Sequence, residues 1–75
     1  MSTGKTTTLH EERARATRRK ILVEATRLFA RQGFHKTTVS DLARAIGMTP
    51  GALFYHFPSK RAILEAVVDR MGRGF

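Results

Sequence analysis

Apolar residues recur at helical spacing along much of the chain, and the clearest pattern lies in its second quarter. Gly33 stands where a left-handed cap is needed to end such a helix, and Phe34 is expected to fold back onto the apolar face. Five apolar residues with the spacing i, i+1, i+4, i+7 and i+8 define that face: Ile21, Leu22, Ala25, Leu28 and Phe29.

The stretch before this helix contains good helix formers but almost no apolar face. Thr8 and Glu11 have the spacing of a capping box, in which the hydroxyl and the carboxylate satisfy N–H groups at a helix start. We therefore expect frayed helix from His10 to Lys20. Residues 1–8 offer no apolar anchor and are expected to be disordered in isolation.

A short amphipathic helix is predicted from Val39 to Ile46. Thr38 is its expected N-cap, and Asp41, three residues later, complements the positive charge of the helix start. Gly47 is a candidate for a left-handed cap at its end.

A third helix is predicted from Pro50 to about His56, because Thr49 is a good N-cap and proline at the first helical position loses no hydrogen bond. Pro58 disfavours helical backbone in the preceding residue and so ends this helix. Ser59 then caps a fourth helix, whose apolar stripe is Ile63, Leu64, Val67, Val68 and Met71. Since no strand pattern is visible, we expect an all-α fold: a three-helix bundle with a helix-turn-helix, plus the start of a fourth helix.

Composition narrows the possible functions. The 75 residues suffice for one domain, and the absence of cysteine excludes disulfides and thiol chemistry, as is common in a reducing cytoplasm. The net charge of +8 points to a polyanionic partner, either nucleic acid or an anionic membrane surface. Residues 1–36 carry nine basic and three acidic side chains. We therefore divide the chain into a basic, flexible and partly helical arm, residues 1–16, and a globular domain, residues 17–75.

The two short helices, joined by residues 47–49, match the spacing of a helix-turn-helix motif. In that motif the second helix inserts its N-terminal end into the major groove of DNA, and the small residues around Gly51 allow close approach. Leu53 and Phe57 would face the core, so Tyr55 and His56 would point outward to phosphates. Either of these two could instead be a core residue.

The run from Thr37 to Val67, TTVSDLARAIGMTPGALFYHFPSKRAILEAV, resembles the DNA-binding domain of tetracycline-repressor-type (TetR family) transcriptional regulators. The resemblance extends over about Thr17 to Met71 and includes Gly-Phe before Thr-Thr, then Leu-Ala, Gly, Gly-x-Leu-Phe-Tyr-His-Phe and Ser-Lys. It implies sequence-specific binding of double-stranded DNA, with repression of transcription as the expected activity. It also implies that the fourth helix links to a ligand-binding and dimerisation domain, and that a homodimer reads a palindromic operator in the bacterial cytoplasm.

The resemblance also assigns roles to residues. Thr38 would bind a phosphate, and Pro50 and Gly51 would lie against bases. Lys60 would be a mobile cation over the backbone. The candidate DNA-binding residues are Thr38, Ser40, Arg44, Thr49, Pro50, Gly51, Ala52, Phe54, Tyr55, His56 and Lys60, and the arm would add Arg13, Arg15, Arg18 and Arg19.

Three departures from the family pattern matter. Pro50 stands where a cation is common, so the base contact there is expected to be absent or apolar. Ala52 and Phe54 stand where hydroxyl-bearing residues are common, which puts two phosphate hydrogen bonds in question. The second domain of the family is absent from the 75 residues, so we expect this chain to be a fragment.

Other classes of function are less well supported by the sequence. Gly4-Lys5-Thr6 lacks the upstream glycine and the strand of a phosphate-binding loop. His10, His35 and His56 have no metal-site spacing, so we expect no metal, no cofactor and no enzymatic activity. The alternatives that remain are a basic protein lying on anionic membranes and a protein-interaction module built on the same fold.

Overall fold

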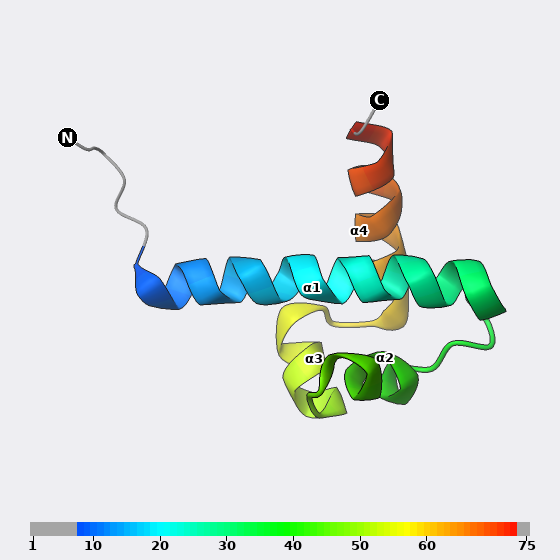
Figure 1. Cartoon of the computed structure of the whole chain (residues 1–75), viewed down its shortest axis with the longest axis horizontal. Coiled ribbons are helices and arrows are strands. Elements are labelled where there is room, and N and C mark those ends of the chain that lie inside the picture. The colour runs from blue at the N-terminus through cyan, green and yellow to red at the C-terminus, as the bar shows by residue number, and fades with distance from the viewer. Residues whose placement is uncertain (1–7, 74–75) are drawn as a thin grey trace.

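The fold of the chain is all-α, as predicted. The computed structural model describes residues 8–73, and within them helices α1 (Leu9–Gln32), α2 (Val39–Ile46), α3 (Pro50–His56) and α4 (Lys60–Arg73) follow in order without a strand. Helices α2 and α3 lie on one side of α1, and α4 crosses α1 and extends beyond its other side (Figure 1). The bounds predicted for the second and third helices are confirmed.

Helix α1 is one continuous helix of 24 residues that begins at Leu9. The predicted capping box is present: the Glu11 N–H donates to Thr8 Oγ1 at 3.1 Å, and the Thr8 N–H donates to Glu11 Oε1 at 3.0 Å. The helix is buried only in its second half, at Ile21 and Ala25. Residues 1–7 of the predicted arm lie outside the described part of the chain, and the flexibility of residues 1–16 stays a prediction.

The core lies where α1 meets the other three helices. The predicted orientation of α3 is confirmed, because Leu53 is 0% and Phe57 only 4% exposed. The stripe predicted for α4 is only partly correct: Val68 and Met71 are 58% and 52% exposed, since α4 runs past the bundle and meets α1 with its first half (Figure 1). The buried apolar residues are Ile21, Ala25, Leu42, Ala43, Leu53, Phe57, Ile63 and Val67.

The turn after α1 depends on a glycine with an unusual backbone. Gly33 has φ 89° and ψ 155°, so it has the positive φ expected but not the left-handed helical conformation. This region of backbone space is essentially confined to glycine. The chain therefore leaves α1 extended, and Phe34 folds back as predicted, with its ring centroid 5.4 Å from that of Phe29 in an edge-on arrangement.

Thr37 is the buried polar residue that closes this turn, and nothing in the sequence pattern distinguished it. Its side chain is 0% exposed, and its hydroxyl lies 2.7 Å from the Gly33 carbonyl oxygen and 3.4 Å from that of Leu28. The last carbonyls of a helix have no partner within the helix and must find one elsewhere. Thr37 thus satisfies the end of α1 from the start of the segment that leads into α2.

We predict that Thr37→Val destabilises the chain by about 1–2 kcal/mol, because it removes the hydroxyl donor from the part-buried bond to the Gly33 carbonyl oxygen while keeping the shape of the side chain. Urea unfolding followed by circular dichroism measures the change. Thr26→Val is the matched control: the Thr26 hydroxyl donates to Leu22 O at 2.7 Å, within α1, where the carbonyl belongs to the helix interior. Equal stability of the two variants would contradict the role given to Thr37.

Candidate DNA interface

The exposed face of α3 is the centre of the candidate interface. Thr49 caps the helix, because its hydroxyl accepts a hydrogen bond from the Ala52 N–H at 3.1 Å, and Pro50 occupies the first turn as predicted. Since Leu53 and Phe57 point into the core, the first turn and the side chain of Tyr55 are left to solvent. The result is a short helix whose N-terminal end offers small residues to a partner.

The turn that leads into α3 has the geometry predicted for it. Gly47 adopts the left-handed conformation, with φ 84° and ψ 34°, and its N–H donates to the Ala43 carbonyl at 2.9 Å. The Met48 N–H donates to the same oxygen at 2.9 Å. The two helices of the motif are therefore joined by a hydrogen-bonded turn rather than by a loose loop.

Gly51 is a glycine that the fold itself does not require. A Cβ added there would meet only the Thr49 hydroxyl oxygen, at 4.0 Å, and the residue is exposed within the helix. Glycine costs roughly 1 kcal/mol relative to alanine in a helix. Its presence at this position therefore has no explanation in the stability of α3.

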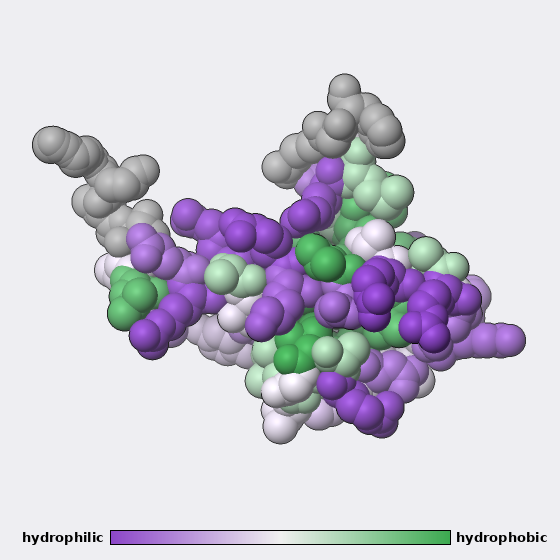
Figure 2. All heavy atoms as spheres, in the orientation of Figure 1, coloured by the Kyte–Doolittle hydropathy of each residue, from purple (hydrophilic) through white to green (hydrophobic). Residues whose placement is uncertain are grey.

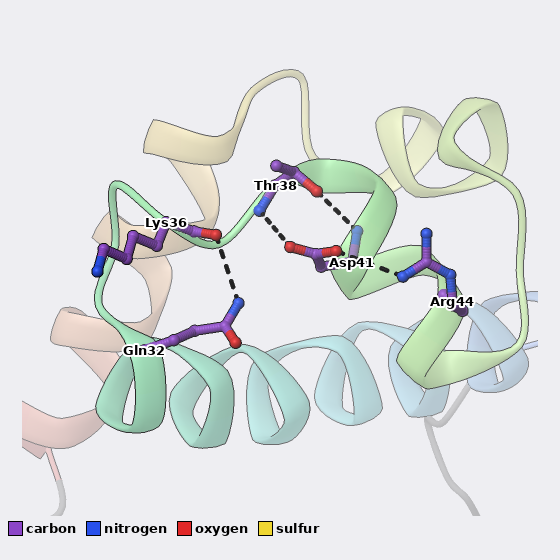
Figure 3. A network of polar contacts seen from close by, with 5 residues as sticks. All are labelled: Gln32, Lys36, Thr38, Asp41 and Arg44. Carbon is purple, nitrogen blue, oxygen red and sulfur yellow. Dashed lines mark hydrogen bonds and ion pairs between the residues drawn. The ribbon is translucent and has the colours of Figure 1, made fainter.

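The start of α2 carries a second group of candidate residues, joined by hydrogen bonds (Figure 3). The Asp41 N–H donates to Thr38 Oγ1 at 2.9 Å, and the Thr38 N–H donates to Asp41 Oδ2 at 3.0 Å, which completes a capping box. Arg44 Nη1 lies 3.4 Å from Asp41 Oδ1, with most of its side chain exposed. The Thr38 side chain is exposed at this helix start, where a hydroxyl can also exchange hydrogen bonds with a phosphate.

The same network acts on the acidity of Asp41. The hydrogen bond from the Thr38 backbone N–H, followed by the hydrogen bond from the Thr38 side chain, holds the pKa of the Asp41 carboxyl below its ordinary value of 3.8. The charge of Arg44 acts in the same direction. The ionised carboxylate therefore stabilises the folded start of α2.

The turn that precedes α2 has a hydrogen bond of its own. Gln32 Nε2 donates to the Lys36 carbonyl at 3.4 Å across this turn (Figure 3).

Tyr55 and His56 differ in their surroundings. Tyr55 is 74% exposed, so the interpretation of this residue as a core aromatic is wrong. His56 is half-buried rather than fully outward, with its ring centroid 5.1 Å from that of Tyr55. The structure thus leaves the Tyr55 hydroxyl open to solvent and turns His56 partly toward its neighbours. Ser40 and Phe54 are exposed as well.

Arg18, one of the predicted arm cations, packs against the end of α3. Its guanidinium carbon lies 4.7 Å from the Phe57 ring centroid, and Nη1 lies 3.5 Å from the His56 carbonyl oxygen. A cation beside the C-terminal carbonyls of a helix is favourable because those carbonyls carry partial negative charge. The contacts of α1 with the other helices therefore begin at least three residues earlier than the apolar pattern indicated.

The other predicted arm cations remain exposed. Arg13, Arg15 and Arg19 are on the surface, and no ion pair within the described part of the chain involves them. Figure 2 shows hydrophilic surface over much of α1. The segment from residue 37 to 57 contains only one acidic and one basic residue, so long-range attraction to a polyanion must come from the helices around it, and chiefly from α1, which has seven basic and three acidic residues.

Lys60 was expected to be a mobile cation, and the structure corrects this. Its Nζ donates to the Phe34 carbonyl oxygen at 2.7 Å and lies 4.1 Å from the centroid of the Phe34 ring. The side chain is engaged by the α1–α2 turn, 26 positions earlier in the chain. Periodicity and spacing carry no signal for this contact, because its two partners are far apart in sequence.

Two features of the described residues bear on other functions. No three histidine, aspartate or glutamate side chains gather there in an arrangement that would hold a metal ion. None of the described helices combines the length and the apolar character needed to cross a membrane.

Comparisons with known proteins agree with the geometry. The family model "Bacterial regulatory proteins, tetR family" matches residues 21–67. The chain is 36% identical over 61 residues to the HTH-type transcriptional regulator TtgR of Pseudomonas putida, which covers 81% of this chain and 29% of that protein. It is 47% identical over 57 residues to the HTH-type transcriptional repressor Rv1474c of Mycobacterium tuberculosis, covering 76% of this chain and 30% of that protein.

A third relative is the HTH-type transcriptional repressor KstR2 of Rhodococcus jostii, with 45% identity over 58 residues, 77% of this chain and 26% of that protein. The chain thus spans less than one third of the length of each of these relatives. No solved structure matches it significantly.

The lowered pKa of Asp41 predicts an acid-sensitive helix start. A carboxyl whose pKa is lower in the folded state contributes stability above its unfolded pKa, near 3.8, and loses it as the pH falls through the folded value. We therefore expect Asp41→Asn to be less stable than the wild type at pH 7 and the difference to shrink below about pH 4. Urea unfolding between pH 7 and pH 2 measures it. A difference that is independent of pH would contradict the prediction.

Proposed function

The chain belongs to the tetR family of bacterial regulatory proteins, and from this premise we propose that it is the operator-reading domain of a transcriptional repressor. The proposed activity is sequence-specific binding of double-stranded DNA, with α3 in the major groove. One observation carries the proposal: α3 is anchored by Leu53 and Phe57 and exposes a first turn of small residues around Gly51. Because the family consists of regulatory proteins, no enzymatic activity is proposed.

The proposed contacts follow from exposure and chemistry. Pro50 and Gly51 would lie against base edges, where Pro50 offers an apolar surface rather than the cation common in the family. Arg44 supplies a charge beside the groove. Hydroxyl, imidazole and ring groups along the same face would meet the phosphate backbone, which positions the helix without reading sequence. The proposed backbone contacts are Thr38, Ser40, Thr49, Ala52, Phe54, Tyr55 and His56.

The exposed cations of α1 would supply the sequence-independent part of the affinity. Arg13, Arg15 and Arg19 lie on a helix that continues past α3 toward its N-terminus (Figure 1). Each phosphate that such a cation neutralises releases counterions and steepens the dependence of affinity on salt. We propose that these arginines contact phosphates flanking the major-groove site, and that residues N-terminal to them reach the adjacent minor groove.

The finer architecture of binding is also a proposal. We propose that the full-length protein binds a palindromic operator as a homodimer, since two-fold symmetric operators match two-fold symmetric proteins. In that arrangement α4 would lead into the part of the protein that dimerises and senses a ligand. The protein would act in the bacterial cytoplasm, where its operator is.

Binding to anionic membranes receives less support. Helices that lie on membranes present one continuous apolar face to the lipid. In this chain each helix contributes apolar residues to a shared core. The large apolar residues that remain exposed are spread over three helices: Leu9, Val23, Phe54, Val68 and Met71.

Gly51→Glu tests the proposed function. The added side chain has open space and is compatible with the start of a helix, so the fold should keep its stability, while bulk and negative charge against DNA should weaken binding on the order of 100-fold or more. The measurement is a titration on a duplex that the wild-type chain enriches from a random-sequence pool. Gly72→Glu is the matched control, because it makes the same change in open space on α4.

Full binding by Gly51→Glu would remove α3 from the interface. Failure of the wild-type chain to enrich any duplex would contradict sequence-specific binding itself.

A second prediction concerns the arginines of α1. The double substitution Arg13→Gln and Arg15→Gln should weaken binding to all duplexes and make the slope of log affinity against log salt shallower by on the order of 1 to 2 units. The preferred sequence should not change, because α3 still reads it. Arg61→Gln with Arg70→Gln is the control, since it removes the same charge from α4. Identical slopes for the two double variants would show that the α1 arginines are merely solvated charge.

A further inference from the structure

Lys60 occupies a position that its charge alone disfavours. It is the first residue of α4, where the helix dipole repels a cation, and the first turn of α4 contains no acidic residue to compensate. Lysine ammonium groups are also strongly hydrated and are usually left in water. The half-buried position of this one therefore requires a compensating interaction.

Within the described part of the chain, that interaction comes from Phe34. The Lys60 ammonium donates to the Phe34 carbonyl at 2.7 Å and stands over the ring of the same residue, 4.1 Å from its centroid. A charged hydrogen bond and a cation–π contact are both stronger when partly shielded from water. The two contacts to one residue fix the ammonium in one place.

Phe34 is itself held in the turn that leads from α1 to α2. Its ring packs edge-on against Phe29, with 5.4 Å between centroids, and lies 5.5 Å from the ring of His35. Three residues later, Thr37 closes the turn with its hydrogen bond to Gly33. Because Lys60 contacts Phe34, it is connected through this short, well-packed segment to the start of α2.

This connection matters because α4 otherwise meets the helix-turn-helix chiefly through α1. Helices α2 and α4 each pack chiefly on α1, and α3 packs chiefly on α2. The contact between Lys60 and Phe34 adds a direct tie between the start of α4 and the entrance to the helix-turn-helix.

We propose that Lys60 is a positioning residue: it ties the start of α4 to the α1–α2 turn and so fixes the helix-turn-helix for DNA, instead of contributing a phosphate contact of its own. The role rests on the DNA binding proposed above. Under this proposal the Lys60 ammonium keeps its contacts with Phe34 when DNA is bound, as in the free protein.

The first test is Lys60→Met, which keeps the aliphatic stem and removes the charge. With both proteins fully folded at low temperature, we expect affinity for the enriched duplex to fall about five- to ten-fold while the salt slope stays that of the wild type. Arg61→Met is the matched control: the Arg61 side chain is 73% exposed and its ion pair with Glu65 is long, at 3.8 Å. It should change affinity less than about two-fold, and Lys60→Arg should restore most of the lost affinity.

The second test combines Lys60→Met with Phe34→Leu. If the two residues act as one unit, the double variant binds no more weakly than the weaker single variant. Additive losses together with a slope shallower by about 0.9 would assign Lys60 to a phosphate and overturn the proposal. A lower melting temperature with unchanged affinity of the folded protein would equally overturn it, by reducing the contact to packing alone.

The proposal can fail separately from the proposed function. If the wild-type chain enriches no duplex, the DNA-binding function fails. The wild type, Lys60→Met, Phe34→Leu and the double variant still give a double-mutant cycle in melting temperature without DNA. A combined loss smaller than the sum of the single losses is expected there. Strict additivity would show that the tie between Lys60 and Phe34 does not exist.

Discussion

The burial of Leu53 and Phe57 is the interaction on which the candidate interface depends. Helix α3 has only seven residues, and an isolated helix of that length is unstable in water. Both side chains enter the core formed with α1, α2 and α4, and the Phe57 ring also carries the Arg18 guanidinium. The face opposite these anchors needs no apolar residue of its own, so it is free to be small and open.

Helix α1 supplies two things that the helix-turn-helix does not supply for itself: a packing surface and positive charge. With Ile21 and Ala25 it provides the surface on which α2 and α4 pack. With its exposed arginines it provides net positive charge, which α2 and α3 together lack, since Arg44 is balanced by Asp41. The exposed face of α3 and the positive charge of α1 thus lie on different helices. Arg18 of α1 connects the two, because it contacts the Phe57 ring and the His56 carbonyl at the end of α3.

Local chemistry made the short helices predictable. The caps at Thr38 and Thr49 and the break before Pro58 act within four residues, so sequence spacing alone located α2 and α3. The positions of Lys60, Arg18 and the outer half of α4 were not predictable in this way. Lys60 and Arg18 contact residues 26 and 38 positions away, and the exposure of Val68 depends on how far α4 extends past α1.

The continuity of α1 sets a fixed geometry between charge and recognition. A straight helix of this length measures about 36 Å, and each residue advances about 1.5 Å and turns about 100°. The exposed arginines near its start therefore lie at a fixed distance along the helix from Ile21 and point in fixed directions around the helix axis. Inserting a single residue between them would swing every upstream cation to a different side of the helix while leaving α3 in place.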